Sequence, residues 1–405
     1  MKHLDPDYGP SVVRTPELGT IYLNVQPHSL TLSQELQATF AFDGEGRPLS
    51  CFLDGRNYRF GLSGAILLKT THPDGKLRRL LAPDEAEELA AAVHTRAARI
   101  ATAVASGCSP TLQAWLERIS AWDSARRTAA CQAFAATYRP ISIVPPDHYQ
   151  AVVIQATEGC SWNQCSFCSF YRDRVFRIKT PAALQEHIDQ IKALLGRGLA
   201  LRRSIFLGDA NALIVPQTRL RELLAVVNAA LPPTTAGGPR GLYAFLDIFG
   251  GEIKSVTDYV ELKEDGIKRI YLGLETGDDE VFRLLNKPGS PAECVEVVQR
   301  IKAAGISVGV ILLAGAGGIG FAERHLSSSL ATLRAMNLSQ DDLVYISPLI
   351  PPATSDYALQ SATLGLQPLD SAMMNAQLAA LRSGAIAASE GQTRVALYHI
   401  EEWLY

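Results

Sequence analysis

Three cysteines stand within nine residues near the middle of the chain, at Cys160, Cys165 and Cys168. Three thiolates on one loop can converge on one metal site, and thiolate ligands favour iron-sulfur clusters or zinc. A structural zinc site needs a fourth ligand. No other cysteine or histidine is adjacent, and the nearest downstream histidine, His187, falls inside a predicted helix. Three ligands leave a metal with an open position, so we favour a reactive cluster, with zinc and purely structural cysteines as alternatives.

The other four cysteines, Cys51, Cys108, Cys131 and Cys294, are scattered singly along the chain. An odd total of seven, with three gathered in one segment, differs from the evenly spread pairs of a disulfide scaffold. Free cysteine is among the most buried residue types. We therefore expect these four side chains to pack as small buried hydrophobic groups.

The elements that must position the cysteine loop are short apolar runs that alternate with helical patterns. Near-continuous hydrophobicity in each run is typical of parallel strands covered on both faces. Six β/α units predict an α/β fold with a partial (β/α)6 TIM-like barrel, which binds ligands at the carboxyl ends of its strands. The predicted strands are 149–156, 203–207, 242–248, 268–274, 307–313 and 343–347, and the predicted helices are 181–195, 216–231, 256–264, 278–285, 291–304 and 321–336.

The chain divides into three parts by pattern. Residues 1–145 predict an N-terminal α+β accessory domain, with a small β-meander and two helical stretches, the second from 109 to 138. The meander is expected between residues 30 and 71. Residues 146–352 carry the barrel pattern, and 353–405 form a short C-terminal extension of one or two helices and a short strand.

Composition narrows the function class. The formal net charge is -3, and charged residues make up 20% of the chain. These values give no global attraction to nucleic acid or anionic lipid. No apolar run reaches the length of a spanning helix, and the first residues lack a signal-peptide core. We expect a cytoplasmic protein that acts on neither nucleic acid nor membrane.

Residues 149–352 resemble the radical S-adenosylmethionine (radical SAM) superfamily, in particular its Elongator, methylthiotransferase and coproporphyrinogen-dehydrogenase-like branch. The resemblance implies that Cys160, Cys165 and Cys168 bind three irons of a [4Fe-4S] cluster and that S-adenosylmethionine chelates the fourth. Electron transfer would then cleave this cofactor to methionine and a 5'-deoxyadenosyl radical. The commonest family spacing has three residues between the first two cysteines, whereas this chain has four.

The same resemblance assigns cofactor contacts. Phe167, directly before the last cysteine, occupies the aromatic position that packs near the adenine. Gly208 and Asp209 stand where the family places the turn that binds the methionine ammonium, with Asp209 as a shifted match. Residues 273–277, Gly-Leu-Glu-Thr-Gly, resemble the Gly-x-Glu-Ser/Thr-Gly signature of the branch. Glu275 would hydrogen-bond the ribose or the methionine moiety.

Further positions follow from the later strands and from the end of the cysteine loop. The backbone near Val310 is expected to pass the adenine, with Gly315 in the glycine-rich loop beyond it. That loop lacks the Gly-Lys-Ser/Thr of a phosphate-binding loop. Tyr171 and Arg172 are candidate catalytic or substrate contacts, although Arg172 could equally be a surface charge. Lys287 resembles the branch but could be a solvated loop charge.

The radical would abstract hydrogen from a small-molecule or peptide substrate, with electrons from a reductant such as flavodoxin or ferredoxin. The alternative is an iron-sulfur electron-transfer or sensing protein that does not cleave S-adenosylmethionine. An electron carrier ordinarily uses four cysteines per cluster. Three cysteines, together with Glu275 on a distant strand, favour an enzyme.

Overall fold

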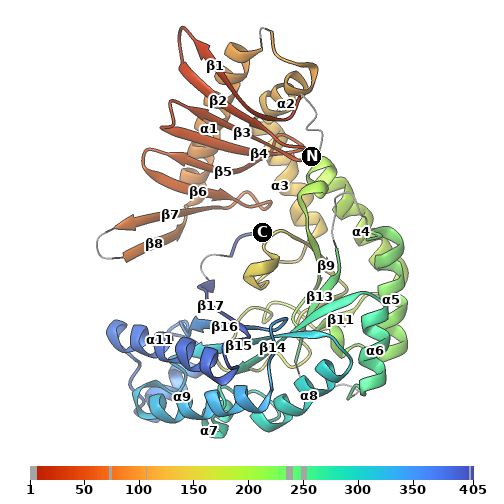
Figure 1. The fold of residues 1–405 in the computed structure, drawn as a ribbon, viewed down its shortest axis with the longest axis vertical. Coiled ribbons are helices and arrows are strands. Elements are labelled where there is room, and N and C mark those ends of the chain that lie inside the picture. The colour runs from red at the N-terminus through yellow and green to blue at the C-terminus, as the bar shows by residue number, and fades with distance from the viewer. Residues whose placement is uncertain (1–6, 73–74, 106, 234–239, 248–252, 401–402) are drawn as a thin grey trace.

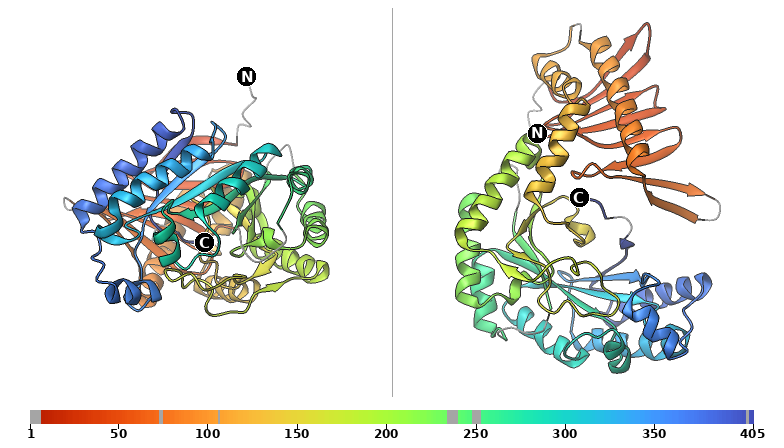
Figure 2. Two further views of the ribbon diagram at one scale, coloured as in Figure 1. Left: turned by 90° about the horizontal axis from the view of Figure 1, so that it is seen from below. Right: turned by 180° about the vertical axis from the view of Figure 1, so that it is seen from behind.

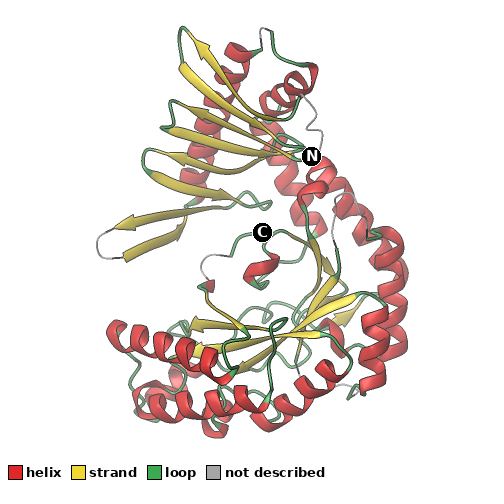
Figure 3. Cartoon of the chain, in the orientation of Figure 1, coloured by secondary structure: helices red, strands yellow, loops and turns green. Residues whose placement is uncertain are grey.

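The structure is a computed structural model that describes residues 7–72, 75–105, 107–233, 240–247, 253–400 and 403–405. It contains an antiparallel sheet in the first part of the chain and a curved parallel sheet in the second, as Figure 1 shows. Figure 3 separates the strands from the helices that line the outer side of the parallel sheet. Among the described residues, no helix is both long and apolar enough to cross a membrane.

The N-terminal sheet is a meander of eight strands, each paired with the next along the chain. Buried and exposed residues alternate along β2, so one face of the sheet packs against two helices while the other is exposed. The strands are β1 (Gly9–Thr15), β2 (Gly19–Val25), β3 (Ser29–Gln34), β4 (Ala38–Asp43), β5 (Pro48–Leu53), β6 (Arg56–Phe60), β7 (Ile66–His72) and β8 (Gly75–Leu80). The meander thus extends beyond the predicted stretch at both ends.

Three helices follow the meander: α1 (Pro83–Val104), α2 (Pro110–Ser120) and α3 (Ser124–Thr137). The single helical stretch expected from 109 to 138 is wrong in one respect, because it is broken between α2 and α3. Asp123 begins α3 by accepting a hydrogen bond from the Arg126 backbone N–H at 2.8 Å. Trp122 is buried at the break, so tertiary packing and a local cap together end α2.

The second part of the chain has the expected α/β fold. Its parallel sheet has the order β17-β16-β15-β14-β13-β12-β9. The strands are β9 (Ala151–Gln155), β12 (Ser204–Gly208), β13 (Leu242–Leu246), β14 (Ile267–Glu275), β15 (Ser307–Ala314), β16 (Leu343–Pro348) and β17 (Arg394–Leu397). The helices between them are α4 (Pro181–Leu195), α5 (Gln217–Ala230), α6 (Val256–Glu264), α7 (Asp279–Leu284), α8 (Pro291–Ala303) and α9 (Gly318–Ala335).

The C-terminal extension adds a seventh strand to the six that the sequence predicted for the barrel. It contains α10 (Asp356–Thr363), α11 (Ser371–Ala388) and β17, which pairs in parallel with β16. Buried Leu381 and Ala385 of α11 join the main hydrophobic core. The extension is therefore part of the barrel wall on this side.

The sheet does not close, so β9 is an edge strand whose polar groups need other partners. The backbone N–H of Val153 donates to the Tyr405 hydroxyl at 3.0 Å, and the Tyr138 hydroxyl donates to the Val153 carbonyl at 2.9 Å. The N–H of Gln155 donates to Nε2 of His187 at 3.1 Å. Side chains thus replace the missing strand along this edge.

The two sheets meet near this edge. The Leu62 N–H, in the turn between β6 and β7, donates to the Tyr405 carbonyl at 2.8 Å. Figure 2 shows, in its right-hand view, the C-terminal end lying between the N-terminal sheet and the barrel. The same residue therefore contacts the accessory sheet and the first barrel strand.

Candidate cofactor site

The cysteine loop follows β9 and a short strand, β10 (Thr157–Glu158), and ends at β11 (Arg177–Ile178). It lies against the end of α7. The Ser166 N–H donates to the Leu285 carbonyl at 3.0 Å, and its hydroxyl donates to the Leu284 carbonyl at 2.8 Å. The Trp162 indole donates to the Asn286 carbonyl at 2.9 Å. These bonds hold the loop over the carboxyl end of the barrel, beside the segment that follows Glu275.

The three thiols are free and half-buried, and they interact electrostatically with one another. Burial raises the pKa of Cys165 to about 12 and that of Cys168 to about 11, and it also raises the pKa of Cys160. Each of the first two is raised further by the field of a neighbouring thiol in the same loop. Without a metal these groups are therefore thiols, and iron binding must displace their protons.

The donor set fits a cluster better than a single ion. In the part of the chain that the structure describes, no group of three or more His, Cys, Asp or Glu side chains could hold one metal ion. In an iron-sulfur cluster the thiolates bind different iron atoms, so they need not meet at one point. Cys160, Cys165 and Cys168 would hold three of the irons.

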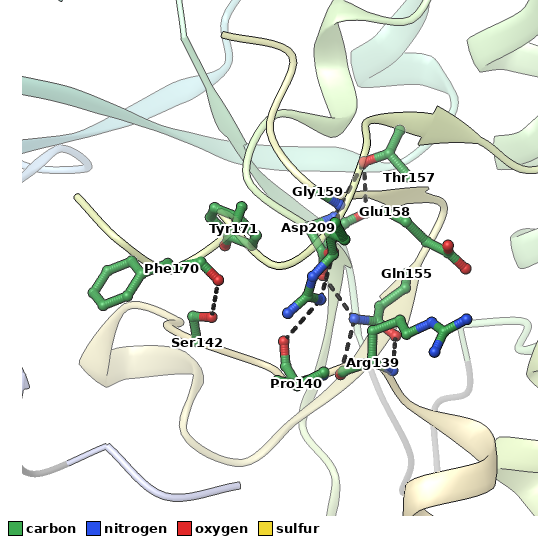
Figure 4. A network of polar contacts seen from close by, with 12 residues as sticks. Arg139, Pro140, Ser142, Gln155, Thr157, Glu158, Gly159, Phe170, Tyr171 and Asp209 are labelled. Carbon is green, nitrogen blue, oxygen red and sulfur yellow. Dashed lines mark hydrogen bonds and ion pairs between the residues drawn. The ribbon is translucent and has the colours of Figure 1, made fainter. Parts of the chain in front are cut away.

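Asp209 is buried at the end of β12 and belongs to the polar network drawn in Figure 4. Its Oδ1 accepts from the Gln155 amide at 2.7 Å, and its Oδ2 accepts from the Gly159 N–H at 2.8 Å. Arg174 Nη1 lies 3.3 Å from Oδ2. Burial raises the pKa of this carboxyl, while these hydrogen bonds and Arg174 lower it. Asp209 therefore holds the backbone immediately before Cys160, whereas its contact with the methionine ammonium stays a prediction.

Gly208 has a backbone role in the same network. Its carbonyl accepts from the Thr157 hydroxyl at 3.2 Å, and the same hydroxyl accepts from the Asp209 N–H at 3.1 Å. A Cβ at this position would meet Val153 and Gln155 at 3.5 and 3.6 Å, which is ordinary contact. Space at the position therefore does not demand glycine, and a cofactor role for Gly208 stays a prediction.

Glu275 ends β14 in the left-handed region, with φ at +63°, which is uncommon for a non-glycine residue. The pairing of β14 with β15 skips a residue between Gly273 and Glu275, and Glu275 is buried. A Cβ on Gly273 would lie 2.2 Å from the Glu275 carboxylate. The glycine two residues before therefore leaves the space that this carboxylate occupies.

Lys287 is the cation beside Glu275. Its side chain is 3% exposed, and Nζ donates to the Gly273 carbonyl at 2.5 Å. Nζ also lies 3.4 Å from Oε1 of Glu275 and 3.6 Å from Oδ1 of Asp247. Burial raises the pKa of Glu275, whereas Lys287 lowers it. The interpretation of Lys287 as a solvated loop charge is therefore wrong, since its ammonium is buried between two carboxylates.

Tyr171 and Arg172, the predicted catalytic pair, have different environments. Tyr171 is buried, its carbonyl accepts from the Asn163 amide at 2.8 Å, and burial raises its pKa, with a further contribution from Asp209. Arg172 is exposed and donates to the Cys165 carbonyl at 3.1 Å, and it pairs with Asp356 at 3.2 Å. The arginine thus braces the cysteine loop against α10, and a substrate contact by either residue stays a prediction.

Phe167 and Val310 are both in apolar surroundings. Phe167 packs in a small cluster with Val281 and Leu285 from the α7 region and Tyr357 from α10. Val310 is fully buried in β15. Phe167 therefore also anchors the cysteine loop to the helices beneath it, and whether its ring contacts the adenine stays a prediction, as does the contact of the Val310 backbone.

The glycine-rich loop after β15 donates its backbone N–H groups to acceptors in the C-terminal extension. The Gly315 N–H donates to Oε1 of Gln377 at 2.6 Å, and the Gly317 N–H donates to the Tyr357 hydroxyl at 2.8 Å. The Ile319 N–H donates to the Gln367 carbonyl at 2.8 Å. These donors are used within the chain, so the loop offers no open phosphate cradle at these positions. The cofactor contact expected at Gly315 stays a prediction.

Sequence reasoning missed the charged partners of the site. Asp247 follows β13, and its N–H donates to the side chain of buried Asn211 at 3.1 Å. From the sequence, Arg174 is a candidate substrate contact or a surface charge, but its side chain is 9% exposed and pairs with Asp209. The available signal was position alone, because Asp247 stands near the end of a predicted strand and Arg174 stands in the cysteine loop after the last cysteine. Whether a charge is buried depends on tertiary contacts, so the sequence does not indicate it.

Comparison with known proteins agrees with this geometry. Residues 154–327 match the family model of the radical SAM superfamily, a range that contains the three cysteines and Glu275. None of the curated proteins matches the chain.

Solved structures with related folds include methylornithine synthase (PylB), with 16% identity, a TM-score of 0.40 and coverage of 60% of this chain and 70% of that one. Coproporphyrinogen III oxidase (HemN) from Escherichia coli has 14% identity, a TM-score of 0.45 and coverage of 64% and 55%. SuiB from Streptococcus suis, bound to S-adenosylmethionine, has 11% identity, a TM-score of 0.44 and coverage of 85% and 72%. At these values the likenesses carry no argument about activity. The family match therefore identifies residues 154–327 as a radical SAM domain.

Proposed function

We propose that this enzyme reductively cleaves S-adenosylmethionine at a [4Fe-4S] cluster held by Cys160, Cys165 and Cys168. When bound, the cluster and S-adenosylmethionine together supply one-electron chemistry that yields methionine and a 5'-deoxyadenosyl radical, which abstracts hydrogen from a substrate. The observation that carries this proposal is the cysteine loop. It presents three thiols and no fourth, and the field of a buried carboxylate on another strand, Glu275, reaches Cys168.

The remaining cysteines support a three-ligand site. Cys51 belongs to the N-terminal sheet, Cys108 follows α1, Cys131 lies in α3, and Cys294 is buried in α8. Cys294 is the nearest of them to the site, since its thiol lies in the field of Lys287 and Glu275. Burial raises its pKa to about 12, and it packs within the main core. An open iron position is what binding of a cofactor to the cluster requires.

The chain's own residues orient the cofactor and shield it. Glu275 offers a carboxylate acceptor for the hydroxyl or ammonium groups of S-adenosylmethionine, in a buried setting where a charge-assisted hydrogen bond is strong. Asp209 and Arg174 fix the start of the cysteine loop, and Ser166 fixes its middle. A loop held at both points keeps its thiols at the same edge of the sheet as Glu275.

We propose a small-molecule or peptide substrate and an external reductant such as flavodoxin or ferredoxin. The near-neutral charge of the whole chain supports a substrate other than nucleic acid. The substrate would occupy the part of the barrel mouth that the cofactor leaves open. Deuterium transfer from a labelled candidate into 5'-deoxyadenosine would identify it.

The decisive experiment is reductive cleavage without the substrate. Anaerobically reconstituted protein is mixed with S-adenosylmethionine and a strong reductant, and methionine and 5'-deoxyadenosine are measured by chromatography. We expect both products, in equal amounts, from protein that holds the cluster and from none that lacks it. An intact, redox-active cluster that neither binds nor cleaves the cofactor would instead identify an electron-transfer or sensing protein and refute the proposal.

A further inference from the structure

Lys287 places a buried, ion-paired ammonium group at the carboxyl end of the barrel. Its ammonium lies within 3.6 Å of oxygens from three residues, two on β14 and one just after β13: Gly273, Glu275 and Asp247. Removing a charge from water is costly unless partners compensate for it. The burial of this side chain is therefore sustained by its contacts with these oxygens.

Glu275 needs a partner of this kind. Its left-handed backbone and the skipped pairing beside it direct the carboxylate away from the regular strand. A Cβ at position 273 would lie 2.2 Å from this carboxylate and 3.0 Å from Nζ of Lys287, so glycine there leaves room for both groups. The conformation of Glu275 and the position of Lys287 thus depend on each other.

The segment that carries Lys287 also carries contacts to the cysteine loop. Asn286, the residue before it, donates through its side chain to the Gln164 carbonyl at 2.7 Å. Its carbonyl accepts from the Trp162 indole at 2.9 Å. Asn286 itself has φ at +51°, so the chain turns sharply there. One short segment therefore joins the cysteine loop on one side to Glu275 on the other.

We propose that Lys287 is a positioning residue that holds the Glu275 carboxylate, ionised and in a fixed orientation, for S-adenosylmethionine. The inference rests on the proposed function and adds a residue to it. Lys287 acts through Glu275 and not by contact with the reacting atoms. Replacing it removes the charge that keeps Glu275 in place, and the cofactor then loses the same interaction that it loses when Glu275 itself is neutralised.

Other charges face the same carboxylate. Asp247 opposes Lys287 by raising the pKa of Glu275. The thiols of Cys168 and Cys294 and the phenol of Tyr398 also lie in its field, and each is a neutral group in the absence of metal, with its pKa raised by burial. Among these neighbours Lys287 is the one that lowers the pKa of Glu275. Its removal is therefore the change that should most affect this carboxylate.

The test is a double-mutant cycle with Lys287→Met, Glu275→Gln and the variant that carries both. Binding of S-adenosylmethionine to the oxidised, reconstituted proteins is measured by equilibrium dialysis, so that no turnover is needed. We expect each single variant to weaken binding by about tenfold to a hundredfold, the range of a charge-assisted hydrogen bond. The double variant should bind S-adenosylmethionine no more weakly than the single variant of lower affinity, because both single changes remove the same interaction. Lys287→Arg should keep most of the affinity for S-adenosylmethionine that Lys287→Met loses.

Two controls make the result specific. Lys302→Met removes another partly buried, paired lysine, which contacts Asp342 at the amino end of the barrel; it should leave cofactor binding unchanged. Iron content should be equal in all variants. Multiplicative effects in the double variant would overturn the proposal. So would loss of iron from Lys287→Met but not from Glu275→Gln, because Lys287 would then support the cysteine loop.

A measurement without the cofactor separates this inference from the proposed function. In protein without iron, Lys287→Met should lower the melting temperature because it leaves a buried carboxylate unpaired. Adding Glu275→Gln should recover part of the loss. If the unaltered protein neither binds nor cleaves S-adenosylmethionine but this recovery is seen, the coupling stands and the proposed function fails. If recovery is absent, the coupling fails whatever the cofactor result.

Discussion

The two ends of the barrel both bury polar groups, but in different ways. At the amino end, His148 Nδ1 lies 2.8 Å from the Ser204 hydroxyl and Nε2 lies 2.8 Å from the Tyr271 hydroxyl. Tyr271 donates to Asp147 at 2.5 Å, and Tyr345 donates to the same carboxylate at 3.0 Å. Because the Tyr271 proton is given to Asp147, His148 must donate from Nε2. Each of these groups has a partner inside the protein.

The carboxyl end instead combines three thiols with a buried, ion-paired carboxylate. Its three thiols have pKa values raised by burial, and Glu275 stands in a strained backbone conformation beside Lys287. Strain and buried charge of this kind persist where a site requires them. We therefore expect substitutions at the amino end to change stability and substitutions at the carboxyl end to change cofactor chemistry.

The largest effect is expected from the cysteine loop. Alanine at Cys160, Cys165 or Cys168 should remove the cluster, since each thiolate is the ligand of one iron. Iron and sulfide analysis after anaerobic reconstitution should show about four of each in the unaltered protein and almost none in the variants. Cys294→Ala is the matched control, expected to keep its iron. Zinc in place of iron, or loss of iron in the control, would contradict the ligand assignment.

Glu275→Gln should come next. It removes a charge-assisted acceptor, so formation of 5'-deoxyadenosine should fall by the equivalent of ~1 to 3 kcal/mol while iron content stays constant. The free energy of unfolding should fall, because the buried Lys287 ammonium loses one of its two counter-charges and keeps only Asp247. A variant that kept full cleavage activity would show that this carboxylate does not contact the cofactor.

Tyr271→Phe tests the opposite end of the barrel. It removes the acceptor of the His148 N–H and one of the donors to Oδ2 of Asp147, which Arg269 still contacts at 3.2 Å; the loss should destabilise the protein by ~1 to 3 kcal/mol. Urea unfolding followed by circular dichroism measures the loss. Cleavage of S-adenosylmethionine by the folded variant should be unchanged; a drop comparable to that of Glu275→Gln would mean that the two ends are coupled.

Acid should act through the buried histidines. Burial lowers the pKa of His148, His187 and His325 to about 4 from 6.5. The unfolded chain therefore takes up protons first as the pH falls, and the stability present above 6.5 is progressively lost down to about 4. Each histidine contributes about 1.4 kcal/mol per pH unit in this window. His148→Gln should make the melting temperature less dependent on pH between these limits. An unchanged slope of melting temperature against pH would show that His148 does not contribute to this dependence.

The smallest effect is expected from Arg172→Gln. Its pair with Asp356 is exposed, and such pairs contribute only ~0 to 1 kcal/mol. If Arg172 serves only to brace the cysteine loop, iron content and cleavage without substrate should stay near normal. Loss of hydrogen abstraction from the true substrate, with cleavage intact, would support the catalytic role that the sequence predicted.

The sequence alone determined the barrel because its signals are local. Alternation of apolar strands with helical patterns located α4 and α6 at their observed bounds and the predicted barrel strands to within two residues at either end, although residue 248, the end of one predicted strand, lies outside the described residues. The three cysteines and the Gly-Leu-Glu-Thr-Gly segment could likewise be recognised from the sequence as candidate site residues, because their residue types and spacing indicate the chemistry directly. Burial on both faces leaves a continuous apolar run that needs no knowledge of the partner strand.

Tertiary structure alone decided which polar groups meet. β17 has only four residues, and its place beside β16 depends on α11 packing against the core. Lys287 resembles any loop lysine in sequence, yet its ammonium is buried by oxygens from residues up to forty positions away. Tyr405 completes the edge of β9 from the far end of the chain. Such contacts join segments that are distant in sequence, and neither propensity nor periodicity, which act over a few residues, records them.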